Sequence, residues 1–283
     1  MTTILSIQSS VAYGHVGNSA ATFPLMRMGL EVWPVLTVHF SNNTSYPSWK
    51  GPLLTTDDVA SVIAGIDELG VLPEVDAVLS GYQGAPTMGA EILKAVALVK
   101  QRNPEAIYCC DPVMGDVGRG MYVRPGIPEF MRDEVVAAAD IMTPNHYELN
   151  YLTGSETSTL DEIVAAAHRL RAAGPRIVLV TSAVVADEPA DHISMIAVSE
   201  DGAWRVTTPL LDYVYTGSGD LTAATFLARY LSGGSVPDAL GETAGVVYSV
   251  LRVTKELGRR ELALVPAQEM LVNPSERFEV SAL

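Results

Sequence analysis

Several features that would narrow the function are missing from this sequence, and cysteine is almost missing. The 283 residues include two cysteines, Cys109 and Cys110, which are adjacent. Neighbours on a strand point to opposite faces, so a disulfide framework is excluded. No apolar run approaches the length needed to cross a bilayer, and residues 1–10 lack the basic start and apolar core of a signal peptide. We therefore expect a cytoplasmic protein.

Basic residues are also scarce. The chain has 18 Lys and Arg against 33 Asp and Glu, which gives a formal net charge of −15. Nucleic acids and anionic membranes need basic patches, so neither is expected as a partner. A phosphate ligand stays open, because backbone N–H groups can bind it locally.

Familiar catalytic motifs are absent as well. No Gly is followed by Lys, which excludes a Walker A loop, and Thr222 stands where a dinucleotide fingerprint would have its third Gly. The sequence contains neither His-Glu-x-x-His nor Gly-x-Ser-x-Gly. With five scattered histidines and two cysteines, no zinc site is expected.

What the sequence does contain is a regular alternation of short β-rich runs and helical patterns. Strands are predicted at 3–8, 31–38, 76–80, 106–110, 140–143 and 176–182. Helices are predicted at 18–29 with Asn18 as cap, 56–69, 86–102, 126–138, from Asn145 onward, and 159–173. A hairpin at 192–199 and 203–208 and helices at 218–232 and 236–257 follow. This order predicts an α/β fold, with a mostly parallel central sheet flanked by helices on both faces and an antiparallel edge hairpin. No linker is visible, so we expect one domain over residues 1–283.

Glycine-rich polar segments follow most of the predicted strands. They are residues 9–18, 39–46, 81–86, 111–120, 144–148 and 183–187. Ligands of such sheets bind beyond the carboxyl ends of the strands, so these segments predict the site.

The segment Thr216-Gly-Ser-Gly-Asp220 opens a predicted helix. Gly217 and Gly219 allow successive N–H groups to point into one cavity, where the helix dipole also favours an anion. Asp220 could accept a proton from an attacking hydroxyl. The alternative is structural, with Ser218 as N-cap and Asp220 as a residue that suits the helix dipole.

Two further segments carry carboxylates. Asp111 and Asp116 lie in Cys110-Asp-Pro-Val-Met-Gly-Asp116, where they could serve Mg²⁺ through water or simply form a turn. Asn145 and Glu148 fit a capping box, and Glu148 could also order a hydrated metal ion. In the first loops, small hydroxyl and amide side chains suit a small polar ligand, and Tyr82 offers a flat face, although ordinary loops have the same composition.

Taken together, these segments resemble the pyridoxal kinase family of the ribokinase-like superfamily. The matching motifs are QSSVAYGHVGN, FSNNTSY, SGYQG, CDPVMGD, TPNHYEL, VTS and GSGDLTAA, which span residues 8–224. The resemblance implies transfer of the γ-phosphoryl group of ATP to the 5′-hydroxyl of pyridoxal, giving pyridoxal 5′-phosphate and ADP. It also implies a cytoplasmic homodimer that needs Mg²⁺ and commonly a monovalent cation, K⁺ or Na⁺.

The resemblance assigns roles to individual residues. Asp220 is implied as the catalytic base, with the backbone of Gly217, Ser218 and Gly219 as the anion hole. The residues implied for the vitamer are Ser9, Thr44, Ser45, Tyr82 and Asp220. The residues implied for ATP are Asp111, Thr143, Glu148, Thr181, Ser182, Gly217 and Ser218. The residues implied for the metal, partly through water, are Asp111, Asp116 and Glu148.

Three positions depart from the family pattern. Asn43 stands where His is frequent, His39 where Gln is frequent, and Ser218 where Thr is usual. The change at Asn43 alters the hydrogen-bond donors near the expected ring. Two alternatives remain: a hydroxymethylpyrimidine kinase of the same superfamily, and a protein that binds B6 vitamers without catalysis.

Overall fold

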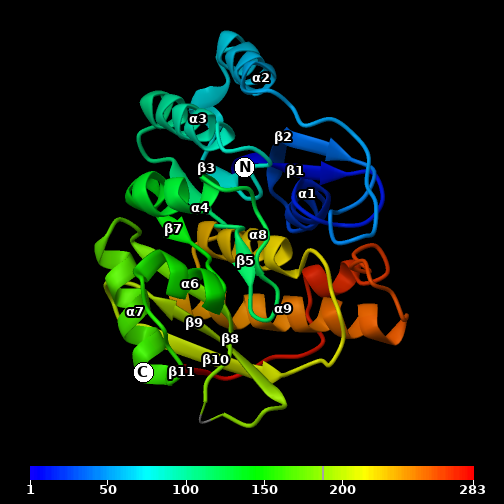
Figure 1. Ribbon diagram of the computed structural model, residues 1–283, viewed down its shortest axis with the longest axis vertical. Coiled ribbons are helices and arrows are strands. Elements are labelled where there is room, and N and C mark those ends of the chain that lie inside the picture. The colour runs from blue at the N-terminus through cyan, green and yellow to red at the C-terminus, as the bar shows by residue number, and fades with distance from the viewer. Residues whose placement is uncertain (187) are drawn as a thin grey trace.

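The computed structural model describes residues 1–186 and 188–283 (Figure 1). Its central feature is a nine-stranded sheet with the order β11-β10-β9-β8-β7-β4-β3-β1-β2. These strands are β1 Thr3–Val11, β2 Glu31–Phe40, β3 Ala77–Ser80, β4 Ile107–Cys110, β7 Ile141–Met142, β8 Ile177–Ala183, β9 His192–Val198, β10 Ala203–Pro209 and β11 Val280–Ala282. A separate two-stranded ribbon is formed by β5 Gly115–Asp116 and β6 Gly120–Met121.

Helices connect most of the strands. The α-helices are α1 Asn18–Arg27, α2 Thr56–Glu68, α3 Met88–Arg102, α4 Ile127–Phe130, α5 Val136–Ala138, α6 His146–Thr153, α7 Leu160–Ala172, α8 Ser218–Leu231 and α9 Val236–Glu256. The 3₁₀-helices are η1 Leu72–Glu74 and η3 Gln268–Leu271, and η2 Met131–Val135 is a π-helix. No described helix is long and apolar enough to span a membrane.

The predicted α/β architecture is confirmed. Neighbouring strands from β2 to β8 pair in parallel, whereas β8–β9, β9–β10 and β10–β11 pair antiparallel. Pro34 lies in the edge strand β2, where a missing N–H can be tolerated. The antiparallel end contains one strand more than predicted, because β11 pairs with β10 and forms the outer edge.

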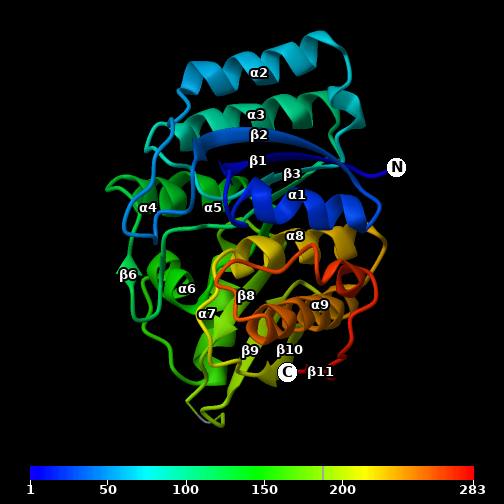
Figure 2. The same ribbon diagram turned by 90° about the vertical axis from the view of Figure 1, so that its right-hand side faces the viewer.

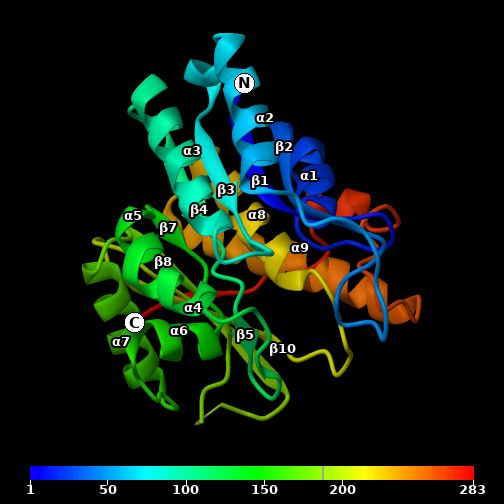
Figure 3. The ribbon, with the colours of Figure 1, turned by 45° about the horizontal axis from the view of Figure 1, so that its top comes forward.

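Helices cover both faces of the sheet and enclose two cores. Apolar side chains of α2, α3, α6 and α7 pack on one face, and those of α1, α8 and α9 pack on the other. Figure 2 shows these two sets of helices on opposite sides of the strands, and in Figure 3 α3 and α1 flank β3 and β1. The adjacent cysteines follow this division, since Cys110 belongs to the first core and Cys109 to the second. Both are buried and free, as the alternation of side chains along a strand predicts.

Local predictions fail at three places. The predicted helix 126–138 is interrupted by the π-helix η2, so that three short segments replace it. Asn18 is not a cap: Gly17 precedes the helix, and the Asn18 amide donates to the carbonyls of Ser6, Gln8 and Val35, which ties β1 to β2. The β5–β6 ribbon was not predicted, because two-residue strands carry no periodic signal.

The helix start predicted at Asn145 is confirmed. Its side chain accepts from the Glu148 N–H, and the Glu148 carboxylate accepts from the Asn145 N–H, at 2.9 Å each. Of the glycine-rich and polar segments predicted for the site, the last ends at Asp187, which lies outside the described residues.

Candidate active site

A cavity of about 230 Å³ opens at the carboxyl edge of the sheet, where the sequence predicts the site. Its walls come from the ends of β1, β2 and β8, the loops after β3, β4 and β7, and the first residues of α8. All residues predicted for the site except Thr143 line it: Ser9, Thr44, Ser45, Tyr82, Asp111, Asp116, Glu148, Thr181, Ser182, Gly217, Ser218, Gly219 and Asp220. Parallel strands bring these distant segments together because their carboxyl ends share one edge.

One end of the cavity has an apolar wall. Val11, Val38 and Phe40 form a buried cluster, and the partly buried Tyr82 packs against it. Burial raises the pKa of the Tyr82 hydroxyl, so the ring is neutral at physiological pH. Ser9, a buried residue that also lines the cavity, adds a hydroxyl group. An apolar, aromatic wall with a few hydroxyl groups suits a flat heteroaromatic ring.

The loop that follows β2 completes the apolar end of the cavity. It contains Asn43, which stands where the family frequently has His. The Asn43 Oδ1 accepts from the Ser45 N–H at 2.9 Å, and its Nδ2 donates to Glu261 Oε1 at 3.1 Å. Both ends of the amide are therefore engaged inside the protein. In this chain Asn43 orders the loop that carries Thr44 and Ser45 to the cavity wall.

The mouth of α8 faces the cavity without a side-chain cap. The N-cap is Gly217, with φ +85°, and Ser218 is the first helical residue, so the structural alternative with Ser218 as N-cap is wrong. A Cβ at Gly217 would collide with the His15 carbonyl oxygen, which explains the requirement for glycine. Because Gly217 has no side chain that could cap the helix, the N–H groups of Ser218 and Gly219 remain available to an anion, whereas the Asp220 carboxylate accepts from its own N–H.

Asp220 lies in the first turn of α8 and lines the cavity. Burial raises its pKa from 3.8 to about 6, although hydrogen bonds from the backbone N–H groups of Gly17 and Asp220 itself act in the opposite direction. A carboxylate with this pKa is deprotonated near neutral pH and more basic than an exposed one. It can therefore act as a general base toward a hydroxyl held beside it.

A second group of carboxylates lies beside the mouth of α8, where Asp111 Oδ2 would be 3.8 Å from a Cβ at Gly219. Burial and the charges of Glu148 and Asp220 raise the pKa of Asp111 well above its usual range. Burial also raises the pKa of Glu148 to about 8, against hydrogen bonds from the N–H groups of Met114, Asn145 and Gly115. Thr143 is buried behind Asp111, and its hydroxyl donates to Asp111 Oδ1 at 3.3 Å. A cation here would relieve the mutual repulsion of these groups.

The donor set fits a hydrated cation. Among residues 1–186 and 188–283, no three His, Cys, Asp or Glu side chains gather closely enough to hold a metal ion by themselves. The cavity does present the carboxylates of Asp111, Asp116 and Glu148, and that of Asp116 is exposed. Mg²⁺ prefers oxygen ligands and usually keeps several waters, which this arrangement permits.

Two residues of the β5–β6 ribbon line the cavity and were missed by the sequence analysis: Arg119 and Tyr122. The Arg119 guanidinium carbon lies 5.1 Å from the centre of the Tyr122 ring. Among the described residues that line this cavity, Arg119 is the one cation. Gly118 and Gly120, both with positive φ, bracket Arg119 and were the available signal of a tight turn.

A second cavity of about 180 Å³ adjoins the first. The two share Thr181 and Ser182 at the end of β8, and Tyr215, Ser218 and Gly219 at and just before the mouth of α8. Ser182 has φ +50°, an uncommon value for a residue other than glycine, and such strain is frequent where a ligand is bound. The remaining wall is largely apolar: Ile193, Met195, Leu210, Leu211, Tyr213, Val247, Tyr248 and Leu251. An apolar slot beside an anion site suits a nucleoside phosphate.

Comparisons with known proteins cover the whole chain. A family model described as phosphomethylpyrimidine kinase matches residues 87–264, which is more than half of it. Pyridoxal kinase PdxY of Rubrobacter xylanophilus is 55% identical over 278 residues, covering 98% of this chain and 96% of the relative. Pyridoxal kinase PdxY of Leifsonia xyli subsp. xyli is 54% identical and covers 98% of each chain.

Solved structures agree with these relatives. Pyridoxal kinase of Leishmania donovani in complex with ADP and ginkgotoxin superposes with a TM-score of 0.93, 32% sequence identity and full coverage of both chains. The same enzyme in complex with ADP and pyridoxine gives a TM-score of 0.91, 32% identity and 99% coverage of both chains.

Proposed function

This chain belongs to the pyridoxal kinases, within the wider family that the phosphomethylpyrimidine kinase model describes, and from that membership and the site geometry we propose its reaction. It transfers the γ-phosphoryl group of ATP to the 5′-hydroxyl of pyridoxal, which yields pyridoxal 5′-phosphate and ADP. The observation that carries the proposal is the position of Asp220. This carboxylate lies in the first turn of the uncapped helix α8 and lines the cavity that has the apolar wall.

The two adjoining cavities hold the two substrates. The pyridine ring lies against Val11, Val38 and Tyr82, with Ser9 and Thr44 near its polar substituents. The nucleoside of ATP occupies the second cavity, which places its phosphates beside Thr181, Ser182 and the first N–H groups of α8. The γ-phosphoryl group then faces the acceptor hydroxyl across Asp220.

Phosphoryl transfer depends mainly on positioning and on stabilising charge. Asp220 takes the proton of the 5′-hydroxyl as that oxygen bonds to the γ-phosphorus and the bond to the bridging oxygen of ADP breaks. The N–H groups of Gly217, Ser218 and Gly219 stabilise the negative charge on the transferred group, and Arg119 adds a positive charge in the same cavity.

Mg²⁺ is proposed as the metal that accompanies ATP. Asp111, Asp116 and Glu148 would hold it, partly through water, and a monovalent cation, K⁺ or Na⁺, would suit the same acidic region. When bound, Mg²⁺ supplies positive charge to the phosphate oxygens.

The decisive experiment is ATP-dependent phosphorylation of pyridoxal, followed by the absorbance of the phosphorylated aldehyde. Pyridoxine, pyridoxamine and hydroxymethylpyrimidine are assayed in parallel. Turnover of pyridoxal with the highest kcat/KM supports the proposal. Turnover of the pyrimidine alone would replace the acceptor, and tight vitamer binding without any turnover would make the chain a binding protein.

The pyrimidine is the second candidate because the matching family model carries the description of a phosphomethylpyrimidine kinase. Its acceptor is also a hydroxymethyl group on a six-membered heteroaromatic ring, which the apolar wall would accept. The proposal favours pyridoxal because two relatives above 50% identity, with nearly full coverage, are pyridoxal kinases.

We further propose that residues 1–283 act as a single kinase domain and work in the cytoplasm as a homodimer. One sheet includes both β1 near the N-terminus and β11 near the C-terminus, which supports a single domain. The homodimer rests on the family resemblance, and sedimentation equilibrium of the purified protein tests it.

A further inference from the structure

One buried carboxylate has no part in the proposed reaction. Glu261 follows α9 and is 8% exposed, and it does not line the cavity. We propose that Glu261 is a positioning residue that holds the two acceptor loops, residues 12–17 and 41–46, in the arrangement that presents the vitamer to Asp220. This inference rests on the proposed function, which places the vitamer at that end of the cavity.

Three donors from these loops converge on the Glu261 carboxylate. Its Oε1 accepts from Asn43 Nδ2 at 3.1 Å and from the Tyr46 hydroxyl at 2.9 Å. Its Oε2 accepts from the His15 N–H at 3.0 Å. Hydrogen bonds to a charged acceptor are stronger than those between neutral groups, so one side chain fixes both loops.

The contacted loops form the acceptor end of the cavity. Asn43, Thr44 and Ser45 line it directly, and Val16 follows His15 into the same wall. The neighbouring Arg260 reinforces the contact, since its Nη2 donates to the Ser45 hydroxyl at 2.6 Å and its guanidinium carbon lies 4.1 Å from the Tyr46 ring centre. Displacement of Glu261 would therefore move the residues that face the vitamer.

The backbone of Glu261 also connects the acceptor loops to the anion site. Glu261 forms a parallel β-bridge with Thr216, which directly precedes the N-cap Gly217. Gly217 in turn packs against the His15 carbonyl, so closely that no side chain fits there. Glu261 thus contacts both the acceptor loops and the residue that precedes the N-cap of α8.

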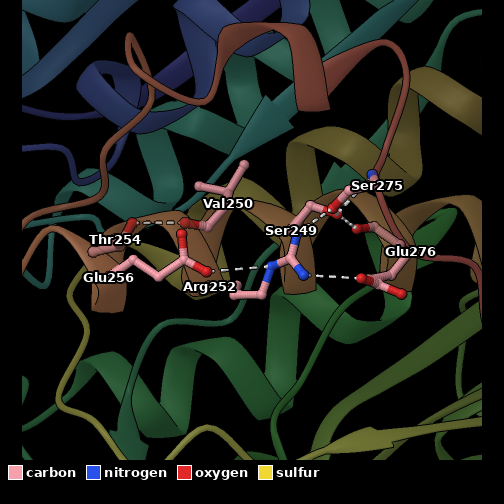
Figure 4. Close-up of polar contacts among 8 residues, drawn as sticks. Ser249, Val250, Arg252, Thr254, Glu256, Ser275 and Glu276 are labelled. Carbon is pink, nitrogen blue, oxygen red and sulfur yellow. Dashed lines mark hydrogen bonds and ion pairs between the residues drawn. The ribbon is translucent and has the colours of Figure 1, made fainter.

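The segment that carries Glu261 has a rigid support. Thr254 in α9 is fully buried, and its hydroxyl donates to the Val250 carbonyl at 2.7 Å and accepts from the Ala263 N–H at 3.0 Å. Figure 4 shows Thr254 on α9. It also shows a second contact between α9 and the segment that follows it, in which Arg252 binds Glu276. These contacts hold both ends of the segment against α9, so the carboxylate projects from a fixed base.

The test compares Glu261→Ala with the wild-type protein under saturating Mg²⁺. We expect KM for pyridoxal to rise about tenfold or more, as the loss of hydrogen bonds to a buried charge implies, while KM for ATP stays within about twofold. Glu261→Gln keeps the shape and part of the hydrogen bonding, so it should recover part of the affinity. The matched control is Glu276→Gln, which removes a carboxylate from the same segment away from the acceptor loops and should leave both KM values unchanged.

A double-mutant cycle separates positioning from simple destabilisation. Tyr46→Phe removes one donor and keeps the ring, so its effect on kcat/KM should be smaller and should largely vanish in the Glu261→Ala background. If Glu261→Ala does not fold, Tyr46→Phe alone serves as the test variant. An unchanged KM for pyridoxal in folded Glu261→Ala, or additive effects in the cycle, would overturn the inference alone. A wild-type protein that does not phosphorylate pyridoxal would contradict the proposed function instead.

Discussion

At the scale of single residues, the proposed mechanism depends on the carboxylate of Asp220. Asp220→Asn keeps the size of the side chain and removes its basicity, so turnover of pyridoxal should fall by about 10²- to 10⁴-fold, the usual contribution of a general base. Binding of ATP and the melting temperature should change little, and calorimetry can measure both. Near-normal turnover by the variant would remove Asp220 from the mechanism.

The raised pKa of Asp220 predicts a pH profile. The proposed mechanism requires the base form of Asp220, whose pKa is about 6 instead of 3.8, so kcat/KM for pyridoxal should fall as the pH drops below about 6. Above that value the carboxylate is already deprotonated, so this group causes no further rise. A binding titration of pyridoxal over the same pH range separates ionisation of the vitamer itself. A fall centred near pH 4 would contradict the effect of burial.

Tyr82 tests the assignment of the apolar wall. Tyr82→Ala removes a ring that packs beside Val11, Val38 and Phe40, and should raise KM for pyridoxal several-fold, since contact with an aromatic side chain contributes about 1 kcal/mol. The KM for ATP should be nearly unaffected, because its proposed site lies at the other end. Steady-state kinetics with each substrate varied in turn decides the matter, and equal effects on both would remove Tyr82 from the ring site.

At the scale of secondary structure elements, helix starts differ in how they are capped. The helices α2, α6, α7 and α9 begin with side-chain capping boxes, whereas α1, α3 and α8 have no side-chain cap, and the start of α8 lines the cavity. Capping stabilises a helix, but it also occupies the N–H groups that an anion would use. The uncapped start of α8 therefore leaves the N–H groups of Ser218 and Gly219 for an anion.

The capping box of α6 serves both stability and the site. Asn145→Ala should cost about 1 kcal/mol of folding stability as a lost cap, and should also raise KM for ATP because the lost side chain lines the cavity and accepts from the Glu148 N–H. Thr159→Ala is the control, since Thr159 caps α7 in the same way and does not line the cavity. Thermal denaturation and kinetics of both variants should give similar losses of stability, with a kinetic effect confined to Asn145→Ala. A kinetic effect in both would mean that global destabilisation is responsible.

At the scale of the whole molecule, the end of the chain completes the sheet. Residues Val280–Ala282 pair with Val206, Arg205 and Trp204, and the Leu283 N–H donates to the Ala203 carbonyl at 2.9 Å. Deletion of residues 279–283 should lower the melting temperature by several degrees, since each kcal/mol corresponds to about 2–4 °C in a chain of this size. It should also promote aggregation, because it exposes the edge of β10.

The strand β11 contributes no residue to the lining of the cavity. Both KM values of the truncated protein should therefore match those of the full chain when they are measured on the folded fraction. Light scattering and differential scanning calorimetry measure the other two effects. An unchanged melting temperature would show that β11 contributes nothing to stability.

Much of this protein was determined by local sequence signals. The alternation of β-rich and helical runs predicts the parallel sheet, Asn145 and Glu148 predict the start of α6, and the glycines around Ser218 predict the mouth of α8. Such features depend on residues only a few positions apart, so their physical cause is visible in a short stretch of sequence.

Other features were decided only by the tertiary structure. The π-helix η2 interrupts a predicted helix. Residues Val280–Ala282 form the strand β11 because they pair with the otherwise unpaired edge of β10. Glu261 accepts hydrogen bonds from Asn43, Tyr46 and His15, which lie 215 to 246 positions away in the chain. No local sequence pattern predicts these contacts. A carboxylate acquires such a role, as Asp220 acquires its raised pKa, from the neighbours that folding places around it.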